Sequence, residues 1–234
     1  MEDEGALDFN FWPSFADLML SLVLVLVLVI FLVMTVITMG TVNLEAVKRN
    51  QRGVVDEIAT SFSAKAVPID QDAIGIWTTG GKDPDIKIRN EPTFQQVTFS
   101  EGILFQPNEF RLNEGGKAVL RTVGAAIKKR LDAIERIQIE GHADTLKTRY
   151  ESNTHLAAFR AIEVFKFLQD PNELNIDPAE HLISATSFGE FNPVRRAQGG
   201  GGARYSRAQL SADNETAEDR GHNRRIELLL FYRR

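Results

Sequence analysis

The sequence predicts an α+β protein with a single membrane-spanning helix near its N-terminal end. The first observation is an apolar run from Leu18 to Met39 that contains no charged residue. The second is the alternation of strand-like and helix-like segments over the C-terminal half. We expect four parts: a short N-terminal segment (1–13), a transmembrane helix (14–40), a helix followed by a linker (41–92) and an α+β domain (93–234).

The apolar run has the length of one membrane crossing. Its 22 residues span roughly 33 Å at ~1.5 Å per residue, which matches the thickness of a bilayer core. A signal peptide has a shorter apolar region behind a basic start. This chain instead starts with Glu2, Asp3 and Glu4, and no basic residue precedes the run. We therefore expect an anchor that is retained.

Asp17 stands at the start of this run, and it is the strongest single indication of function. An ionised carboxylate at the edge of the hydrocarbon costs free energy, so such a residue usually binds an ion or proton or pairs with a partner helix. The alternative is an interfacial aspartate that caps a helix N-terminus, where the helix dipole favours a negative charge.

The segment after the membrane run is expected to be an amphipathic helix from about 43 to 63, because its apolar residues recur at helical spacing. A solvated linker is the alternative. Proline and glycine residues between 67 and 92 indicate turns. Alternating or apolar segments predict strands at 86–89, 97–99 and 103–105.

Two helices and three further strands are expected in the C-terminal half. Asn113 is a good N-cap for a helix to about Leu131, and a second helix is expected from Leu156 to Leu168. Strand patterns cover 137–141, 182–188 and 225–231. This order favours a sheet with helices on one face. A glycine-rich surface insertion (196–221) interrupts it, with a short helix near 207–213. Its four glycines lack the Lys-Ser or Lys-Thr of a phosphate-binding loop.

Composition excludes several classes of site. The chain has no cysteine, which excludes disulfides, zinc–thiolate sites and thiol catalysis. Its four histidines show no ligand spacing, so no metal is expected, and His142 is expected to be packed or hydrogen-bonded at a strand end. A net charge of −5 argues against nucleic-acid binding. We find no catalytic constellation, so we expect neither an enzyme nor a cofactor.

Five ordered motifs in residues 95–234 resemble the OmpA-like domain of the OmpA, Pal and MotB families. They are Ile103-Leu104-Phe105 with Gly115, Glu140-Gly141-His142-Ala143-Asp144-Thr145, the segment from Asn153 to Ala161, Phe188-Gly189-Glu190-Phe191-Asn192-Pro193, and Asn223-Arg224-Arg225-Ile226-Glu227. The resemblance implies a periplasmic domain that binds the diaminopimelate of peptidoglycan stem peptides.

The resemblance also assigns site residues. It implies that Asp144 takes the ligand ammonium and Arg160 a ligand carboxylate, a complementary pair in physical terms. Their spacing is one residue longer than is usual in the family, which the loop between them can absorb. The same motifs place Thr145, Asn153 and Leu156 around the pocket, with Arg224 assisting. The alternative is that Asp144 is only a turn residue and Arg160 only an exposed helix residue.

The segment from Phe11 to Met19 resembles the membrane motif of MotB, whose aspartate carries the translocated ion. The Phe11-Trp12 pair and the lack of a basic N-terminal tail are closer to ZorB, the MotB-like subunit of Zorya anti-phage defence. The resemblance implies an inner-membrane stator subunit, a homodimer inside a ring of MotA-like (ZorA-like) multi-pass subunits. The alternatives are a flagellar stator subunit, a structural tether without ion flux, and a TolR-like or ExbD-like energy transducer.

Membrane orientation is the point of conflict. The domain would be periplasmic and the N-terminus cytoplasmic, if the ligand is the cell wall. Lys48, Arg49 and Arg52 on the domain side instead favour a cytoplasmic domain under the positive-inside rule. We expect the periplasmic orientation of the domain, because the resemblance to the OmpA-like domain implies it.

Overall fold

The computed structural model describes residues 11–63, 66–70, 73–78, 81–198 and 204–233. Residues 1–10 and the run Gly199–Gly202, on which the sequence analysis commented, lie outside the described residues. The chain divides into two compact units, Met1–Glu45 and Ala46–Arg234.

The first unit is the N-terminal part of helix α1 (Trp12–Ser61). Over Trp12–Thr38 this helix is long and apolar enough to cross a membrane, judged by length and composition. Its side chains there are largely exposed, as a lipid-facing surface requires. The hydroxyls of Ser21, Thr35 and Thr38 each donate to a backbone carbonyl one turn earlier, so they add no unpaired polar group.

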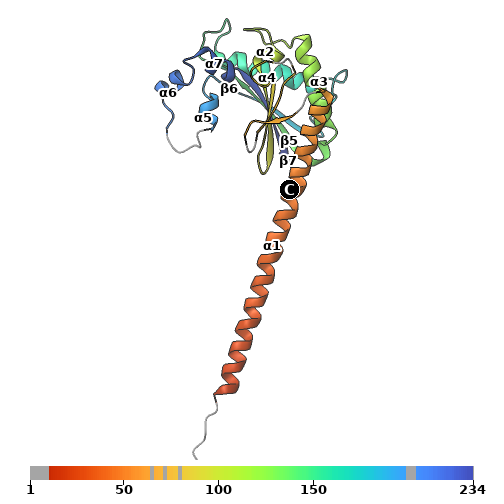
Figure 1. The fold of residues 1–234 in the computed structure, drawn as a ribbon, viewed down its shortest axis with the longest axis vertical. Coiled ribbons are helices and arrows are strands. Elements are labelled where there is room, and N and C mark those ends of the chain that lie inside the picture. Colours follow the sequence, from red (N-terminus) through yellow and green to blue (C-terminus); the bar gives the residue numbers. More distant parts are fainter. Residues whose placement is uncertain (1–10, 64–65, 71–72, 79–80, 199–203, 234) are drawn as a thin grey trace, which may run out of the picture. The chain divides into compact units, whose positions relative to one another are not determined.

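In the described residues, the second unit is built on a seven-stranded sheet with the order β1-β2-β3-β4-β7-β5-β6. Figure 1 labels β5, β6 and β7 of this sheet. Its strands are β1 (Val67–Pro68), β2 (Ala73–Ile76), β3 (Ile86–Asn90), β4 (Phe94–Ser100), β5 (Ile134–His142), β6 (Leu182–Gly189) and β7 (Arg225–Tyr232). Neighbouring strands are antiparallel except β5 and β6, which are parallel and joined through helix α4 (Asn153–Gln169). A helical crossover is the usual way to connect parallel neighbours.

One face of this sheet forms the hydrophobic core. Val97 and Phe99 of β4 point into it, together with the alternating apolar residues of β3, β5 and β7. Helices α3 (Glu114–Lys128) and α4 supply the second layer. The final turns of α1 complete it with Val47, Val54, Val55 and Ile58.

The opposite face of β3 and β4 is polar and lines a groove. Lys87, Gln96, Thr98 and Ser100 alternate with the core residues and face this groove. The insertion borders it with α7 (Ala217–Asn223), which follows α5 (Val194–Gln198) and α6 (Arg207–Ala212). Both α6 and α7 start with capping boxes, at Ser206 and Thr216.

Most expected elements are present, and two expectations differ from the structure. The compact unit begins at Ala46 instead of residue 93, because the helix after the membrane run packs in the core and β2 and β3 extend the sheet. The predicted strand at 103–105 is instead the short helix α2 (Glu101–Leu104), followed by an isolated bridge from Phe105 to Leu112. A 3-10 turn (Leu131–Ala133) leads into β5.

Close packing of β5 against α4 fixes the position of the site. A Cβ atom on Gly141 would lie 2.1 Å from the carbonyl oxygen of Ala157, a distance that side chains do not tolerate. Glycine at this position therefore lets α4 approach the end of β5. This contact brings the residues after β5 next to the first turns of α4.

Candidate functional site

Asp144 lies just beyond the C-terminal end of β5 and is nearly buried, at 5% exposure. Its Oδ1 accepts a hydrogen bond from the backbone N–H of Leu146 at 3.0 Å, an arrangement typical of aspartate in turns. Its Oδ2 accepts from Nη1 of Arg224 at 2.5 Å. Asp144 is thus both a turn residue and one partner of an ion pair that lines the groove.

Arg160 projects from α4 and is buried, with only 1% of its surface exposed. Its Nε donates to the carbonyl oxygen of Glu109 at 2.8 Å, and its Nη2 donates to the carboxylate of Glu101. Burial lowers the pKa of Arg160, against the opposing charge of Glu101. The guanidinium is therefore held between protein groups and is not exposed on the helix surface.

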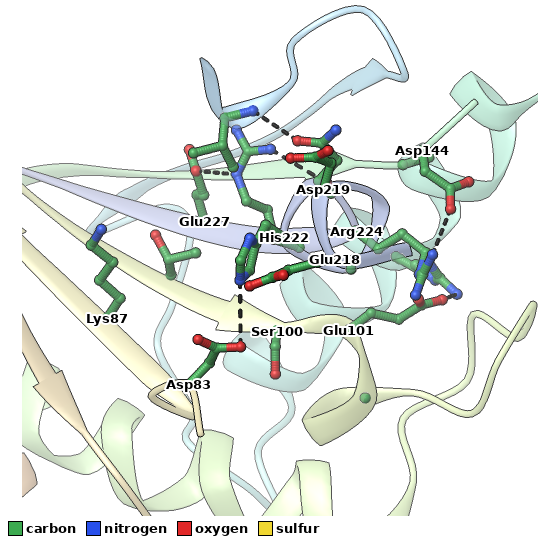
Figure 2. A pocket seen from close by; sticks show the side chains of 18 of the residues that line it. Asp83, Lys87, Ser100, Glu101, Asp144, Glu218, Asp219, His222, Arg224 and Glu227 are labelled. Carbon is green, nitrogen blue, oxygen red and sulfur yellow. Dashed lines mark hydrogen bonds and ion pairs between the residues drawn. The ribbon is translucent and has the colours of Figure 1, made fainter. Parts of the chain in front are cut away.

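Arg224 is the more accessible guanidinium of the site, with about a third of its side chain exposed. It follows α7 and donates from Nε to Glu101 and from Nη1 to Asp144 (Figure 2). Burial works to lower the pKa of Arg224, but the bond to Asp144 and the charges of both carboxylates raise it overall. The structure thus pairs Asp144 directly with Arg224, while Arg160 reaches Asp144 only through Glu101 and Arg224.

Glu101 is a site residue that the sequence analysis missed. Its carboxylate lies between Arg160 and Arg224, and its backbone N–H donates to the carbonyl of Arg224 at 3.0 Å. The sequence signal was an acidic residue directly after the end of a strand. Strand patterns at 97–99 and 103–105 do not by themselves distinguish a site carboxylate between them from a loop residue.

The remaining predicted residues divide between the groove and the surface. Asn153 and Leu156, in the first turns of α4, line the groove next to Asp144, and Leu156 is buried. Thr145 is exposed and is not among the described residues that line it. The groove has a volume of about 1600 Å³ and extends from these residues across β4 to α7. At its α7 end lie Asp83 and His222, an ion pair at 3.5 Å when His222 is protonated (Figure 2).

A second cluster of titratable groups is buried where β5 and β7 pair. His142 Nε2 lies 3.6 Å from Glu140 and 3.5 Å from Glu227, and neither ring nitrogen has a hydrogen-bond partner among the described residues. Ligand atoms of these three residues could hold a metal ion. Arg225 donates to Glu227, so one of the two carboxylates already has a cationic partner among the described residues.

This cluster strongly perturbs one carboxyl group. Burial on its own would raise the pKa of Glu227, but His142 and the charge of Arg225 outweigh it and lower this pKa to about 2. His142 also stacks on Phe188, with ring centres 5.4 Å apart. The packed strand-end role expected for His142 matches this environment. The third member of the cluster comes from a strand distant in sequence, which is why spacing along the chain did not reveal it.

Asp17 lies in the second turn of α1, exposed within the segment that can cross a membrane. Because the helix begins at Trp12, Asp17 is not an N-cap, and the dipole effect falls off beyond the first turn. At the start of the helix Phe11 stacks on Trp12, and Phe15 meets Trp12 edge to face; aromatic residues are enriched at membrane interfaces. The capping alternative therefore does not describe Asp17.

The fold and its matched segment define the class: an N-terminal apolar helix together with an OmpA-like α/β domain. The sequence model of the OmpA family matches residues 104–207. Among characterised relatives, the chain is 28% identical over 143 residues to Motility protein B of Bacillus subtilis (strain 168). The matched region covers 57% of this chain and 47% of that protein. The chain spans about half the length of the curated relatives it matches.

Two solved structures share the fold. A putative MotB-like protein from Desulfovibrio vulgaris has a TM-score of 0.57 and 22% identity, covering 84% of this chain and 97% of that one. The periplasmic domain of Helicobacter pylori MotB (residues 78-256) has a TM-score of 0.50 and 21% identity, covering 64% and 84%. At these identities the likeness concerns the fold alone.

Proposed function

We propose that this chain is the peptidoglycan-anchored stator subunit of an ion-driven rotary motor in the bacterial inner membrane. One observation carries the proposal: the same chain joins a membrane-compatible helix containing Asp17 to an OmpA-like domain. The similarity to Motility protein B supports this combination. A lone helix would expose Asp17 to lipid, so the ion path needs a second copy and a ring of MotA-like multi-pass subunits.

In this proposal Asp17 alternates between its protonated and ionised forms as ions cross. Asp17→Asn keeps the shape and removes the titratable charge, so it should abolish motor function and leave membrane insertion intact. Ser21→Ala is the matched control, since the Ser21 hydroxyl only donates to backbone carbonyls one turn earlier. Phage-protection and motility assays at equal membrane levels are the measurement. Full activity of the asparagine variant would leave a structural tether without ion flux as the better explanation.

We further propose that the groove at Asp144 and Arg224 binds the diaminopimelate-bearing stem peptide. Asp144 would take the ammonium, and Arg224 would take a carboxylate because it is the more exposed guanidinium. Asp144→Ala should weaken pulldown on purified peptidoglycan about ten- to a hundredfold, the typical effect of losing a charge-assisted contact. Glu163→Gln is the control, because Glu163 lies on α4, pairs with Arg111 and does not line the groove. Wild-type binding by a folded Asp144 variant would contradict this site.

Among such motors we propose Zorya anti-phage defence, with a flagellar stator as the alternative. The support is the Phe11-Trp12 pair and the acidic N-terminal residues. The neighbouring genes decide between them. A MotA-like gene beside helicase or nuclease genes supports Zorya, and a MotA-like gene within a flagellar operon supports the alternative. The proposed orientation is an N-terminus in the cytoplasm and the domain in the periplasm.

A further inference from the structure

The groove contains a carboxylate of the chain itself where a ligand carboxylate would be expected. Glu101 accepts hydrogen bonds from Arg160 through Oε1 and from Arg224 through Oε2. Its side chain is only 11% exposed, yet it lines the groove beside both arginines. Figure 2 shows Glu101 and Asp144 on either side of the Arg224 guanidinium.

The four side chains form a closed, neutral set. Two guanidinium groups, of Arg160 and Arg224, face two carboxylates, of Glu101 and Asp144. Nε and Nη1 of Arg224 already donate to Glu101 and Asp144, so a ligand carboxylate that takes either of these bonds replaces an internal carboxylate. A displaced Glu101 carboxylate would lose one of its two guanidinium partners while its side chain stays nearly buried, which is unfavourable.

A zwitterionic ligand avoids this penalty. Its carboxylate can replace Glu101 on Arg224, and its ammonium can pair with Asp144 and with the released carboxylate of Glu101, which flank the same guanidinium. The pair between Glu101 and Arg224 is replaced by pairs to both charges of the ligand, and the net charge of the site does not change. We propose that Glu101 is a specificity-determining residue, which makes the groove accept amino-acid head groups and reject simple carboxylates. This inference rests on the proposed binding of the stem peptide in the same groove.

The test compares two small ligands of equal length on the full chain in detergent micelles. Meso-diaminopimelic acid carries two ammonium groups, and pimelic acid is the same dicarboxylate without them. Calorimetric or NMR titration should show that the wild type binds diaminopimelic acid more tightly than pimelic acid by at least about tenfold. In Glu101→Gln, the charged carboxylate that competes with a ligand carboxylate for Arg160 and Arg224 is removed. Pimelic acid should then bind about tenfold more tightly or better, and the selectivity should shrink.

Two further variants separate specificity from scaffolding. Glu101→Asp keeps the charge and should restore most of the selectivity. Glu173→Gln removes a carboxylate that pairs with Arg121 outside the groove, and it should leave both affinities unchanged. Thermal unfolding of every variant shows whether the fold is retained.

The outcomes distinguish this inference from the proposed function. If the wild type binds diaminopimelic acid and a folded Glu101→Gln variant keeps its selectivity, Glu101 is only a scaffold and the inference is wrong. The same conclusion holds if that variant loses affinity for both ligands equally. If the wild type binds neither the two ligands nor purified peptidoglycan, the proposed function fails and the inference fails with it.

Discussion

Replacing Arg160 by alanine should destabilise the fold before it affects binding. The Arg160 side chain is nearly inaccessible and bonds two groups, the Glu109 carbonyl and the Glu101 carboxylate. Breaking a buried ion pair by removing one partner typically costs ~3–5 kcal/mol. Because Arg224 still pairs with Glu101 in the variant, we expect the lower end, about 3 kcal/mol. For a domain of this size, this loss lowers the Tm by roughly 6–12 °C.

Thermal unfolding followed by circular dichroism measures this shift. Arg195→Ala is the control, since Arg195 is largely exposed and its bond to Asp219 at 2.9 Å is a surface ion pair. Such exposed pairs contribute little to stability, so the Tm should shift by at most a few degrees. An Arg160→Ala variant that kept the wild-type Tm but lost peptidoglycan binding would refute the reasoning. It would make Arg160 a direct ligand contact, as the family resemblance implied.

Three other predictions follow from the domain and its placement. Glu227, with its pKa lowered to about 2, stabilises the fold above pH ~4.5. That contribution, on the order of 3 kcal/mol, should be lost as the pH falls from ~4.5 to ~2, and acid unfolding of Glu227→Gln should be flatter there. Gly141→Ala should lower the Tm by at least several degrees, because its Cβ would meet the Ala157 carbonyl; an unchanged Tm would show that β5 and α4 can separate. Leu182→Cys, at a 61% exposed position in a chain without cysteine, should react with an impermeant thiol reagent once the outer membrane is permeabilised; reaction only after inner-membrane lysis would reverse the proposed orientation.

Sequence pattern predicted the elements whose residues have strong periodicity. The Asn113 cap formed as expected, with its side chain accepting from the N–H of Gly116, and the alternation in 137–141 and 225–231 became β5 and β7. The prediction of a strand at 103–105 was wrong because Ile103 and Leu104 belong to the short helix α2, which follows β4. Apolar pattern alone cannot separate these two conformations over so few residues.

The site was predicted only in part, for a related reason. Asp144 and Arg224 meet as partners although 80 positions separate them, and Glu101 joins them from a third segment. Motif resemblance could indicate each basic or acidic residue. It could not show that Arg160 is buried while about a third of the Arg224 side chain is exposed. Burial depends on how segments that are distant in the sequence pack together.

The position of β7 in the sheet has a consequence for folding during synthesis. It comes last in sequence among the seven strands, yet it lies between β4 and β5. A nascent chain that has emerged only as far as β6 therefore holds two half-sheets with exposed, unpaired edges. Such edges invite aggregation until the missing strand arrives. Arg224 immediately precedes this strand, so its ion pairs with Glu101 and Asp144 form in the same step that completes the sheet.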